Sequence, residues 1–445
     1  MLARKLLTGL TLAAGPLAAQ TPSIADSVAA LERAGKWEAA ARLIDPGLAA
    51  ARTTEERCAL LFDGLLAGTR LWRYAGAPRQ LRAFDDECAA SKVATIEARR
   101  IADLRQELDL PPMPVEPVDW TAVDQFWMAV DTLSRGIEPS RAQWRALVTS
   151  PGYRIAMLSH SDLPRLIDIA FNPARRSERD SILSRPSSDS GTIDHLLSAA
   201  AARDTLRQYR AAIEPTIGDT IAAAIRSAAR FLPDAATDHT APPLVTFTLF
   251  AADGYSQQPG IVLDLYHVRE TGLTTFLSHE FHHSFASAFD RTRPPPGAPD
   301  LRLYLAIRQL RGEGIADMID KPFPLREPPD MQWYADSYNA AYERTPGMLH
   351  TLDSLLVVAG AHPEAVADIG QRAQRMLIYG SHPNGAYMAR TILETFGRDS
   401  LVAGVYSPFH YIRTFIAAQK ERGEPPSFTA AGIAVLDDME KRYAR

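Results

Sequence analysis

Two histidines and a glutamate in the middle of the chain have the types and spacing of a catalytic metal site. The stretch 277–285 reads Leu-Ser-His-Glu-Phe-His-His-Ser-Phe and contains the pattern His-Glu-x-x-His. Residues four apart on a helix lie on the same face, so His279 and His283 could bind one zinc ion. Glu280 would lie beside them, placed to act as general base on a zinc-bound water.

A catalytic zinc ion usually has three protein ligands and one open position, so the chain must supply a third ligand. A histidine six residues after the second ligand is typical of the metzincins, but Phe289 occupies that position. Glu313 follows within a second helical pattern and is the predicted third ligand. Asp317 lies four residues later, on the same face, where it could accept a hydrogen bond from a ligand histidine. The intervening His282 is turned about 100° from the ligand next to it, which predicts a role behind the ligands or on the surface.

These residues predict hydrolysis of a peptide bond by the zinc-bound water. Zinc lowers the pKa of its bound water towards about 7. Glu280 would take the proton and later pass it to the leaving amine. The attacked carbonyl becomes an oxyanion, which zinc and a second donor would stabilise.

The pattern Glu313-Gly-Ile-Ala-Asp317 after His-Glu-x-x-His resembles the gluzincins, the thermolysin-like metallopeptidases. The match covers two helices and their spacing, and the rest of the chain does not resemble thermolysin. Gluzincins use a histidine or tyrosine from the C-terminal half as the second donor, so the resemblance implies this role for His382 or Tyr387. The alternative is structural, with His382 capping a helix start and Tyr387 in the core.

A wider pattern over roughly residues 119–400 resembles a family of bacterial proteins described as "putative zinc-dependent peptidases". It includes Phe-Trp at 126–127, Pro-Gly-Tyr at 151–153 and the segment 382–388, which reads His-Pro-Asn-Gly-Ala-Tyr-Met. This resemblance implies the same gluzincin assignment and brings no known substrate.

The elements that must position these residues begin near residue 241. Residues 243–250 and 261–266 are rich in β-branched and aromatic residues, which predicts two antiparallel strands. The second strand precedes the histidine helix, for which Thr274 or Thr275 is the expected N-cap. An exposed edge of this strand could hold an extended peptide across the metal.

Helical patterns dominate the rest of the chain. We therefore predict an α+β, mainly helical fold: a zincin-like core with a small sheet beside two metal-binding helices, and an N-terminal helical domain. That domain contains one tetratricopeptide-like hairpin. Because a repeat array needs about three units, a helical cap is favoured over a partner-binding array, although partner contact stays possible. The predicted division is an N-terminal domain at 20–110, a Pro-rich linker at 111–118 and a peptidase domain at 119–445, with the metal core at 241–320 and a C-terminal helical part at 331–445.

The first 19 residues predict a secretory signal peptide. Arg4 and Lys5 give a positive start, an interrupted apolar stretch follows, and small residues favour cleavage after Ala19. The mature protein would be periplasmic or secreted, with no membrane span. In an oxidising compartment Cys58 and Cys88 either form a disulfide or remain two buried thiols, and the sequence leaves both alternatives open.

Composition excludes some classes of function. The chain has 445 residues, which is long enough for two or three domains. Its residues are 46% hydrophobic and 23% charged, as is usual for a globular protein. The net charge of −5 and the lack of a dense Lys/Arg cluster argue against nucleic-acid binding, so a peptide or protein substrate is the predicted partner. One alternative is a zinc hydrolase of non-peptide amides or esters, because zinc polarises any carbonyl. Another is a helical binding protein with an inactive or structural metal site. A structural zinc site would have four protein ligands.

Overall fold

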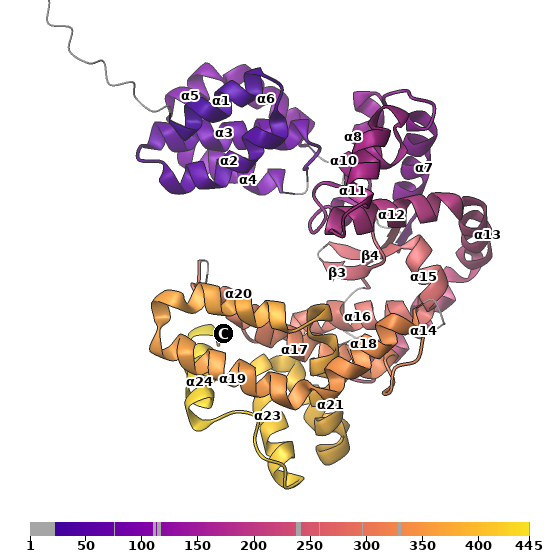
Figure 1. Cartoon of the computed structure of the whole chain (residues 1–445), viewed down its shortest axis with the longest axis vertical. Coiled ribbons are helices and arrows are strands. Elements are labelled where there is room, and N and C mark those ends of the chain that lie inside the picture. Colours follow the sequence, from indigo (N-terminus) through magenta and orange to yellow (C-terminus); the bar gives the residue numbers. More distant parts are fainter. Residues whose placement is uncertain are drawn as a thin grey trace, which may run out of the picture. The chain divides into compact units, whose positions relative to one another are not determined.

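The protein divides into two compact units, one of residues 1–110 and one of residues 111–445. A computed structural model describes their elements, which are labelled along the chain in Figure 1. The predicted signal peptide lies outside the described residues, as does most of the predicted linker. The described residues are 23–74, 76–109, 113, 117–236, 242–257, 259–295, 297–327 and 331–444.

The first unit consists of helices that pack against their neighbours in sequence. They are α1 (Ile24–Arg33), α2 (Trp37–Ala50), α3 (Thr54–Arg70), α4 (Ala77–Cys88), α5 (Lys92–Ile96) and α6 (Ala98–Glu107). The Ser23 and Thr53 side chains begin α1 and α3 by accepting backbone hydrogen bonds from the first helical turns. Gly35, with φ of +68°, makes the turn between α1 and α2. Cys58 and Cys88 form a disulfide between α3 and α4, which decides between the two alternatives that the sequence left open.

Helices also form the first part of the second unit. They are α7 (Thr121–Leu133), α8 (Arg141–Thr149), α9 (Pro151–Ala156), α10 (Leu163–Phe171), α11 (Arg176–Leu183), α12 (Ser188–Ala201), α13 (Arg203–Ile213) and α14 (Ile217–Ala229). Arg203 and Arg210 of α13 lie over the indole rings of Trp127 and Trp120, at 4.7 and 4.8 Å from the ring centroids. These cation–π contacts join α13 to α7 and to the residue just before it.

The second unit also contains one small sheet, which packs against α7 and α9. Its strands are β1 (Val118–Asp119), β2 (Leu244–Thr248), β3 (Gly254–Gln257) and β4 (Gly260–Asp264), in the order β1-β2-β4-β3. Both faces are covered, so every residue of β2 and β4 is buried. On one face the Tyr255 hydroxyl donates to the Ala156 carbonyl of α9 at 2.7 Å. On the other face Gly254 lies against Phe276 of α16 (Leu273–Phe289). Figure 1 shows β3 and β4 next to α16.

The predicted antiparallel pairing of the two strands is wrong, because β2 and β4 run parallel. The chain between them forms β3, which pairs antiparallel with β4 and occupies the edge of the sheet. The second predicted strand also ends early, since the Asp264 side chain accepts a hydrogen bond from the His267 N–H at 2.9 Å and starts α15 (Leu265–Thr271). The edge that could receive a peptide therefore belongs to β3.

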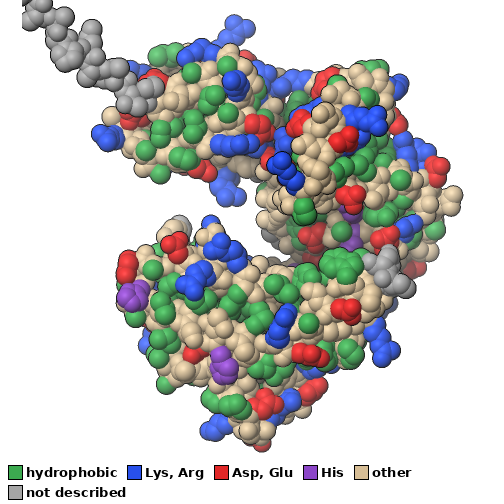
Figure 2. Space-filling view, viewed as in Figure 1, with side chains coloured by type: hydrophobic (Ala, Val, Ile, Leu, Met, Phe, Trp, Pro, Cys, Tyr) green, Lys and Arg blue, Asp and Glu red, His purple; other side chains and the backbone are tan. Residues whose placement is uncertain are grey.

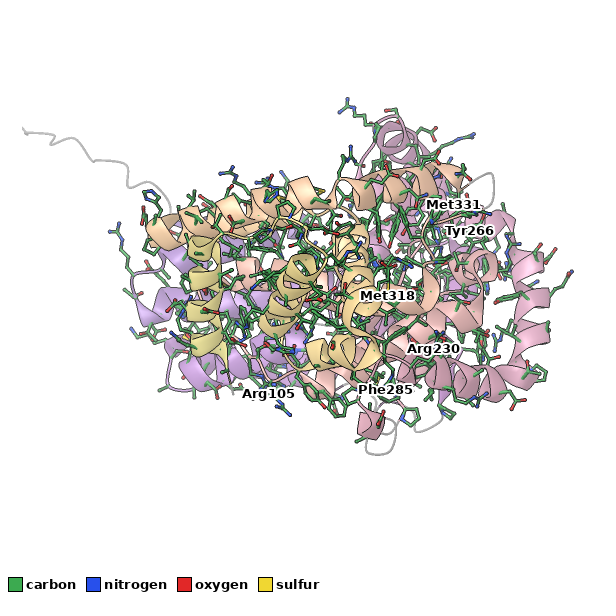
Figure 3. The ribbon with its side chains drawn as sticks, turned by 90° about the horizontal axis from the view of Figure 1, so that it is seen from below. Arg105, Arg230, Tyr266, Phe285, Met318 and Met331 are labelled. Atoms are coloured by element: carbon green, nitrogen blue, oxygen red, sulfur yellow. A yellow bond between two sulfur atoms is a disulfide. The ribbon has the colours of Figure 1, made fainter. Side chains whose placement is uncertain are left out.

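Helices form the remainder of the second unit, and their side chains fill the space between them (Figure 3). They are α17 (Leu301–Asp320), α18 (Gln332–Glu343), α19 (Thr345–Ala361), α20 (Val366–Met376), α21 (His382–Phe396), α22 (Arg398–Ala403), α23 (Pro408–Glu421) and α24 (Ala430–Tyr443). Short 3-10 helices lie at 173–175, 214–216, 234–236, 363–365, 379–381 and 404–406. The protein is thus mainly helical with one small sheet, as predicted. In the described part of the chain, no helix is long and apolar enough to cross a membrane.

Candidate metal centre

Helix α16 carries the predicted pair of histidines. It begins at Leu273, directly after Gly272, whose φ of +94° turns the chain away from α15. The predicted cap by Thr274 or Thr275 is wrong, because Gly272 occupies the N-cap position and no described side chain caps this end. α16 packs against α14, α17 and β3, so both flanks of the histidine pattern are buried.

Helices α17 and α21 bring the remaining side chains to α16. The two helices approach so closely that a Cβ atom on Gly314 would lie 2.4 Å from the Gly385 carbonyl oxygen. Only glycine fits such a contact without moving a backbone. The approach places Glu313 of α17 beside His382, the first residue of α21, with 3.4 Å between Glu313 Oε2 and His382 Nε2.

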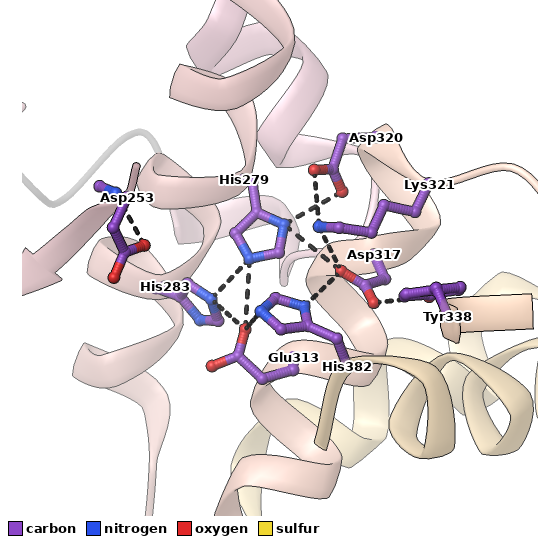
Figure 4. A network of polar contacts seen from close by, with 10 residues as sticks. Asp253, His279, His283, Glu313, Asp317, Asp320, Lys321, Tyr338 and His382 are labelled. Atoms are coloured by element: carbon purple, nitrogen blue, oxygen red, sulfur yellow. Dashed lines mark hydrogen bonds and ion pairs between the residues drawn. The ribbon is translucent and has the colours of Figure 1, made fainter. Parts of the chain in front are cut away.

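The three predicted ligands converge on one point (Figure 4). His283 Nε2 lies 2.9 Å from Glu313 Oε2, and His279 Nε2 lies 3.3 Å from the same oxygen. The two Nε2 atoms are 3.0 Å apart. Within the described ranges these residues form a group whose ligand atoms all lie within 4.8 Å of one another. Two side chains that are four apart on α16 thus meet one side chain of α17.

The chemistry of this donor set fits zinc, which prefers imidazole nitrogens and accepts one carboxylate in catalytic sites. The group has three members among the described residues, and His382 lies beside it without joining it. The His279 side chain is 5% exposed, whereas His283 and Glu313 are each 21% exposed. The group is thus buried at His279 and partly exposed to solvent at His283 and Glu313. A catalytic ion needs such an open position.

Glu280 is buried beside the two histidines. Its Oε2 atom has no hydrogen-bond partner among the described residues. Burial raises the pKa of Glu280 to about 7, and the charges of the neighbouring histidines oppose the shift. A carboxyl group with this pKa can both take up and release a proton near neutral pH.

Two carboxylates of α17 lie behind the imidazoles. His279 Nδ1 is 3.0 Å from Asp320 Oδ1 and 3.7 Å from Asp317 Oδ1. Asp317 lies closer to His382, with 2.8 Å between Asp317 Oδ1 and His382 Nδ1. Burial would raise the pKa of Asp317, but the charges of His382 and Lys321 lower it, so this buried carboxylate stays ionised. Asp317 therefore mainly holds His382, and Asp320 has the position behind a ligand histidine that was predicted for Asp317.

A second group of possible ligands consists of His279, Asp317 and His382. The Lys321 ammonium already lies 2.8 Å from Asp317 Oδ1. The Tyr338 hydroxyl donates to the other oxygen, Oδ2, at 2.9 Å. Since Asp317 is paired with a cation and a hydroxyl, the group around Glu313 is the better metal site.

The two predicted oxyanion donors have different surroundings. His382 stands at the metal group, with its ring centroid 5.3 Å from that of His279 and its side chain 24% exposed. Tyr387 is not brought to the group. Its ring packs against Tyr342 and Phe415, with centroids 5.3 and 6.1 Å away, in an aromatic part of the core. The structural interpretation of Tyr387 therefore fits its position.

His282 faces away from the metal group and is buried. Its Nε2 atom lies 3.3 Å from the Phe231 carbonyl oxygen, to which a neutral imidazole donates. Burial lowers the pKa of His282 to about 3, so the ring stays neutral. The prediction that His282 is not a ligand agrees with this position, but a surface location is wrong.

Sequence reasoning missed Asp320, Lys321, Tyr338 and Asp253. Asp320 had a readable signal, because it lies seven residues after Glu313 and therefore on the same face of α17. Asp253 directly precedes the edge strand β3 and is drawn beside the metal group in Figure 4. Nothing in the spacing of Lys321, Tyr338 or Asp253 predicts these positions, since each depends on how separate elements pack.

The chain resembles one family of known proteins. A family model described as "Putative zinc dependent peptidase (DUF5700)" matches residues 144–424. This range contains the histidine helix, Glu313 and His382. No curated protein and no solved structure matches the chain.

Proposed function

The chain belongs to the family described as "putative zinc dependent peptidase", and from this premise we propose that it is a zinc metallopeptidase of the gluzincin type. In this proposal His279, His283 and Glu313 bind one zinc ion. Glu280 is the general base, and His382 is the donor to the oxyanion. The peptide substrate and the zincin-like arrangement of the core are parts of the same proposal.

One observation carries the proposal. Two imidazole nitrogens and a carboxylate oxygen from two helices lie within 4.8 Å of one another, beside a buried glutamate. The group is partly exposed to solvent at Glu313 and His283. A structural zinc site would have four protein ligands and no open position, so the alternative of a binding protein with a structural metal finds no support in this group.

The surrounding residues can supply the remaining steps of hydrolysis. When bound, zinc would act as a Lewis acid on the substrate carbonyl and lower the pKa of water. Glu280 takes the proton from the attacking water and delivers it to the leaving nitrogen. Asp317 accepts from His382 Nδ1, which leaves Nε2 directed at the metal group, 3.4 Å from Glu313 Oε2. When both of its ring nitrogens carry a proton, His382 can donate from Nε2 to the developing oxyanion.

The edge strand supports a peptide over a smaller amide or ester. β3 ends the sheet and starts against α16, where a Cβ on Gly254 would lie 2.5 Å from Phe276 Cε1. Phe276 is one helical turn before Glu280. An extended peptide can add to a free sheet edge through main-chain hydrogen bonds, which would place its backbone next to the catalytic group.

Export belongs to the proposal as well. Its support is the charged and apolar start of the chain and the Cys58–Cys88 disulfide, which is typical of oxidising compartments.

The decisive experiment compares Glu280→Gln with wild type. The amide has nearly the same shape but cannot accept the proton, so kcat on a mixed peptide library should fall about 10²–10⁴-fold. Zinc content, measured by metal analysis of the purified protein, should stay at one ion per chain because the ligands are unchanged. Glu270→Gln, the same change at an exposed position of α15, is the matched control and should leave both quantities unchanged.

Two results would contradict the proposal. Full peptide hydrolysis by Glu280→Gln would remove its role as the base. Wild-type protein without stoichiometric zinc would remove the metal site itself.

A further inference from the structure

Lys321 lies between the two carboxylates that hold the imidazoles of the metal centre. Its Nζ atom is 2.8 Å from Asp317 Oδ1 and 3.0 Å from Asp320 Oδ2. The lysine side chain is 16% exposed, and the Asp317 and Asp320 side chains are 0% and 9% exposed. One ammonium group therefore contacts two buried acids at once.

These contacts form one connected path through the site, which Figure 4 shows in a single view. Asp320 contacts Nδ1 of the ligand His279, and Asp317 contacts Nδ1 of His382. With Nδ1 of each ring held from behind, both Nε2 atoms face Glu313 Oε2, at 3.3 and 3.4 Å. The orientation of both imidazoles thus depends on where the two carboxylates stand.

Asp317 and Asp320 repel each other if they lack a counter-charge. They lie three residues apart, near the end of α17, and so occupy adjacent positions on one face. Two buried carboxylates at this separation are strongly unfavourable unless a cation is fixed between them. Lys321 is that cation. The Tyr338 hydroxyl donates only to Asp317 and cannot compensate for Asp320.

We propose that Lys321 is a positioning residue that keeps both carboxylates in place, and through them orients the zinc ligand His279 and the oxyanion donor His382. This inference rests on the proposed function. Within the described part of the chain, the Lys321 ammonium pairs with Asp317 and Asp320, so it would act on the imidazoles through these two carboxylates. A single side chain would thereby connect metal binding with stabilisation of the oxyanion.

The competing explanation is that Lys321 only ends helix α17. Its backbone N–H donates to the Asp317 carbonyl at 2.9 Å, and a cation at a helix C-terminus interacts favourably with the helix dipole. Loss of the side chain would then lower stability alone. The two explanations predict different effects of losing the Lys321 side chain. A positioning role predicts lower zinc affinity and lower kcat, whereas a role in ending the helix predicts no change in either.

The test uses the full chain with Lys321→Met, Lys321→Arg and the matched control Lys420→Met, which makes the same change at an exposed position of α23. Zinc affinity is measured by chelator competition, without substrate. Loss of such an outer partner typically weakens metal binding or activity about 10–100-fold. Lys321→Met should show this loss in zinc affinity and in kcat, with KM nearly unchanged. Lys321→Arg keeps the charge and should recover most of both, and Lys420→Met should match wild type.

A second measurement covers the case that Lys321→Met does not fold. In zinc-loaded wild type, nitrogen-15 NMR should detect protons on Nδ1 of both His279 and His382, assigned by single His→Gln variants. Absence of either proton would overturn the inference. So would a folded Lys321→Met protein with wild-type zinc affinity and kcat. If wild type itself binds no zinc, the proposed function fails instead, so the two failures are distinguishable.

Discussion

His382 and Tyr387 show how two residues of one helix can have different surroundings. Both belong to α21 and both were candidates for the oxyanion donor. Five residues on a helix correspond to a rotation of about 140°, so the two side chains point in different directions. His382 faces Glu313 and Asp317, whereas Tyr387 packs against Tyr342.

This difference gives a prediction for single substitutions. His382→Ala should lower kcat on a peptide substrate about 10²–10³-fold, the usual effect of removing one oxyanion donor. Zinc content should not change, because His382 is outside the ligand group. Tyr387→Phe removes only a hydroxyl in an aromatic cluster and should leave kcat within about twofold of wild type. The reverse ranking of the two variants in steady-state kinetics would exclude His382 as the donor.

Helical spacing predicted that His279 and His283 face the same way, because helical geometry ties residue number to direction. Glu313 was a candidate on a separate predicted helix, and its approach to the histidines depends on how α16 and α17 pack. The same rule applied to α17 would have found Asp320. It could not find which carboxylate contacts which histidine. Asp317 meets His382 only because α21 packs on α17, and no pattern within either segment encodes that contact.

At the scale of elements, the close approach of α17 and α21 determines where Glu313 and His382 lie. A Cβ atom on Gly385 would lie 2.3 Å from the Leu310 carbonyl oxygen and 2.7 Å from the Gly314 nitrogen. These neighbours are backbone atoms, which cannot rotate away as a side chain would. Any added methyl group must therefore push the two helices apart, and with them Glu313 and His382.

We expect Gly385→Ala to destabilise the protein by about 1–3 kcal/mol, as overpacking usually does. Zinc affinity and kcat should fall together, because Glu313, the proposed carboxylate ligand, and His382, the proposed oxyanion donor, are displaced at the same time. Gly347→Ala in α19 is the matched control, since nothing lies within 4 Å of its added Cβ. Alanine favours the helix, so this control should be neutral or slightly stabilising. Denaturant unfolding and chelator competition measure the two effects, and equal behaviour of both variants would contradict the argument.

The sheet marks the limit of prediction at this scale. Composition correctly indicated strands near residues 244–248 and 260–264, both of which are fully buried. It did not indicate β3, whose Gly-Tyr-Ser-Gln sequence has little strand preference. If β3 is not recognised, β2 and β4 are consecutive strands and predict a hairpin. Their parallel pairing therefore could not be inferred. The edge strand next to the metal centre was therefore assigned to the wrong segment.

At the scale of the whole molecule, every residue of the proposed site belongs to the second unit, residues 111–445. The first unit has its own core, with Val28, Ala40, Ile44 and Leu60 buried together, and its own disulfide. Two units with separate cores should unfold as two transitions, of which only the second should depend on zinc.

The disulfide allows this independence to be tested in the full chain. Cys58→Ser with Cys88→Ser opens a loop of sequence separation 30, for which chain entropy predicts a loss of about 3–4 kcal/mol from the first unit. Hydrogen exchange followed by mass spectrometry should show faster exchange in peptides from α1 to α6, and unchanged exchange in α16, α17 and α21.

Zinc affinity and kcat of the double variant should equal those of wild type, because no proposed ligand or catalytic group lies in the first unit. A reducing agent should reproduce the faster exchange in wild type and have no effect on the double variant, which serves as its own control for the reagent. A weaker zinc affinity or a lower kcat in the double variant would mean that the first unit supports the metal centre. The first unit would then contribute to catalysis although it has a core of its own.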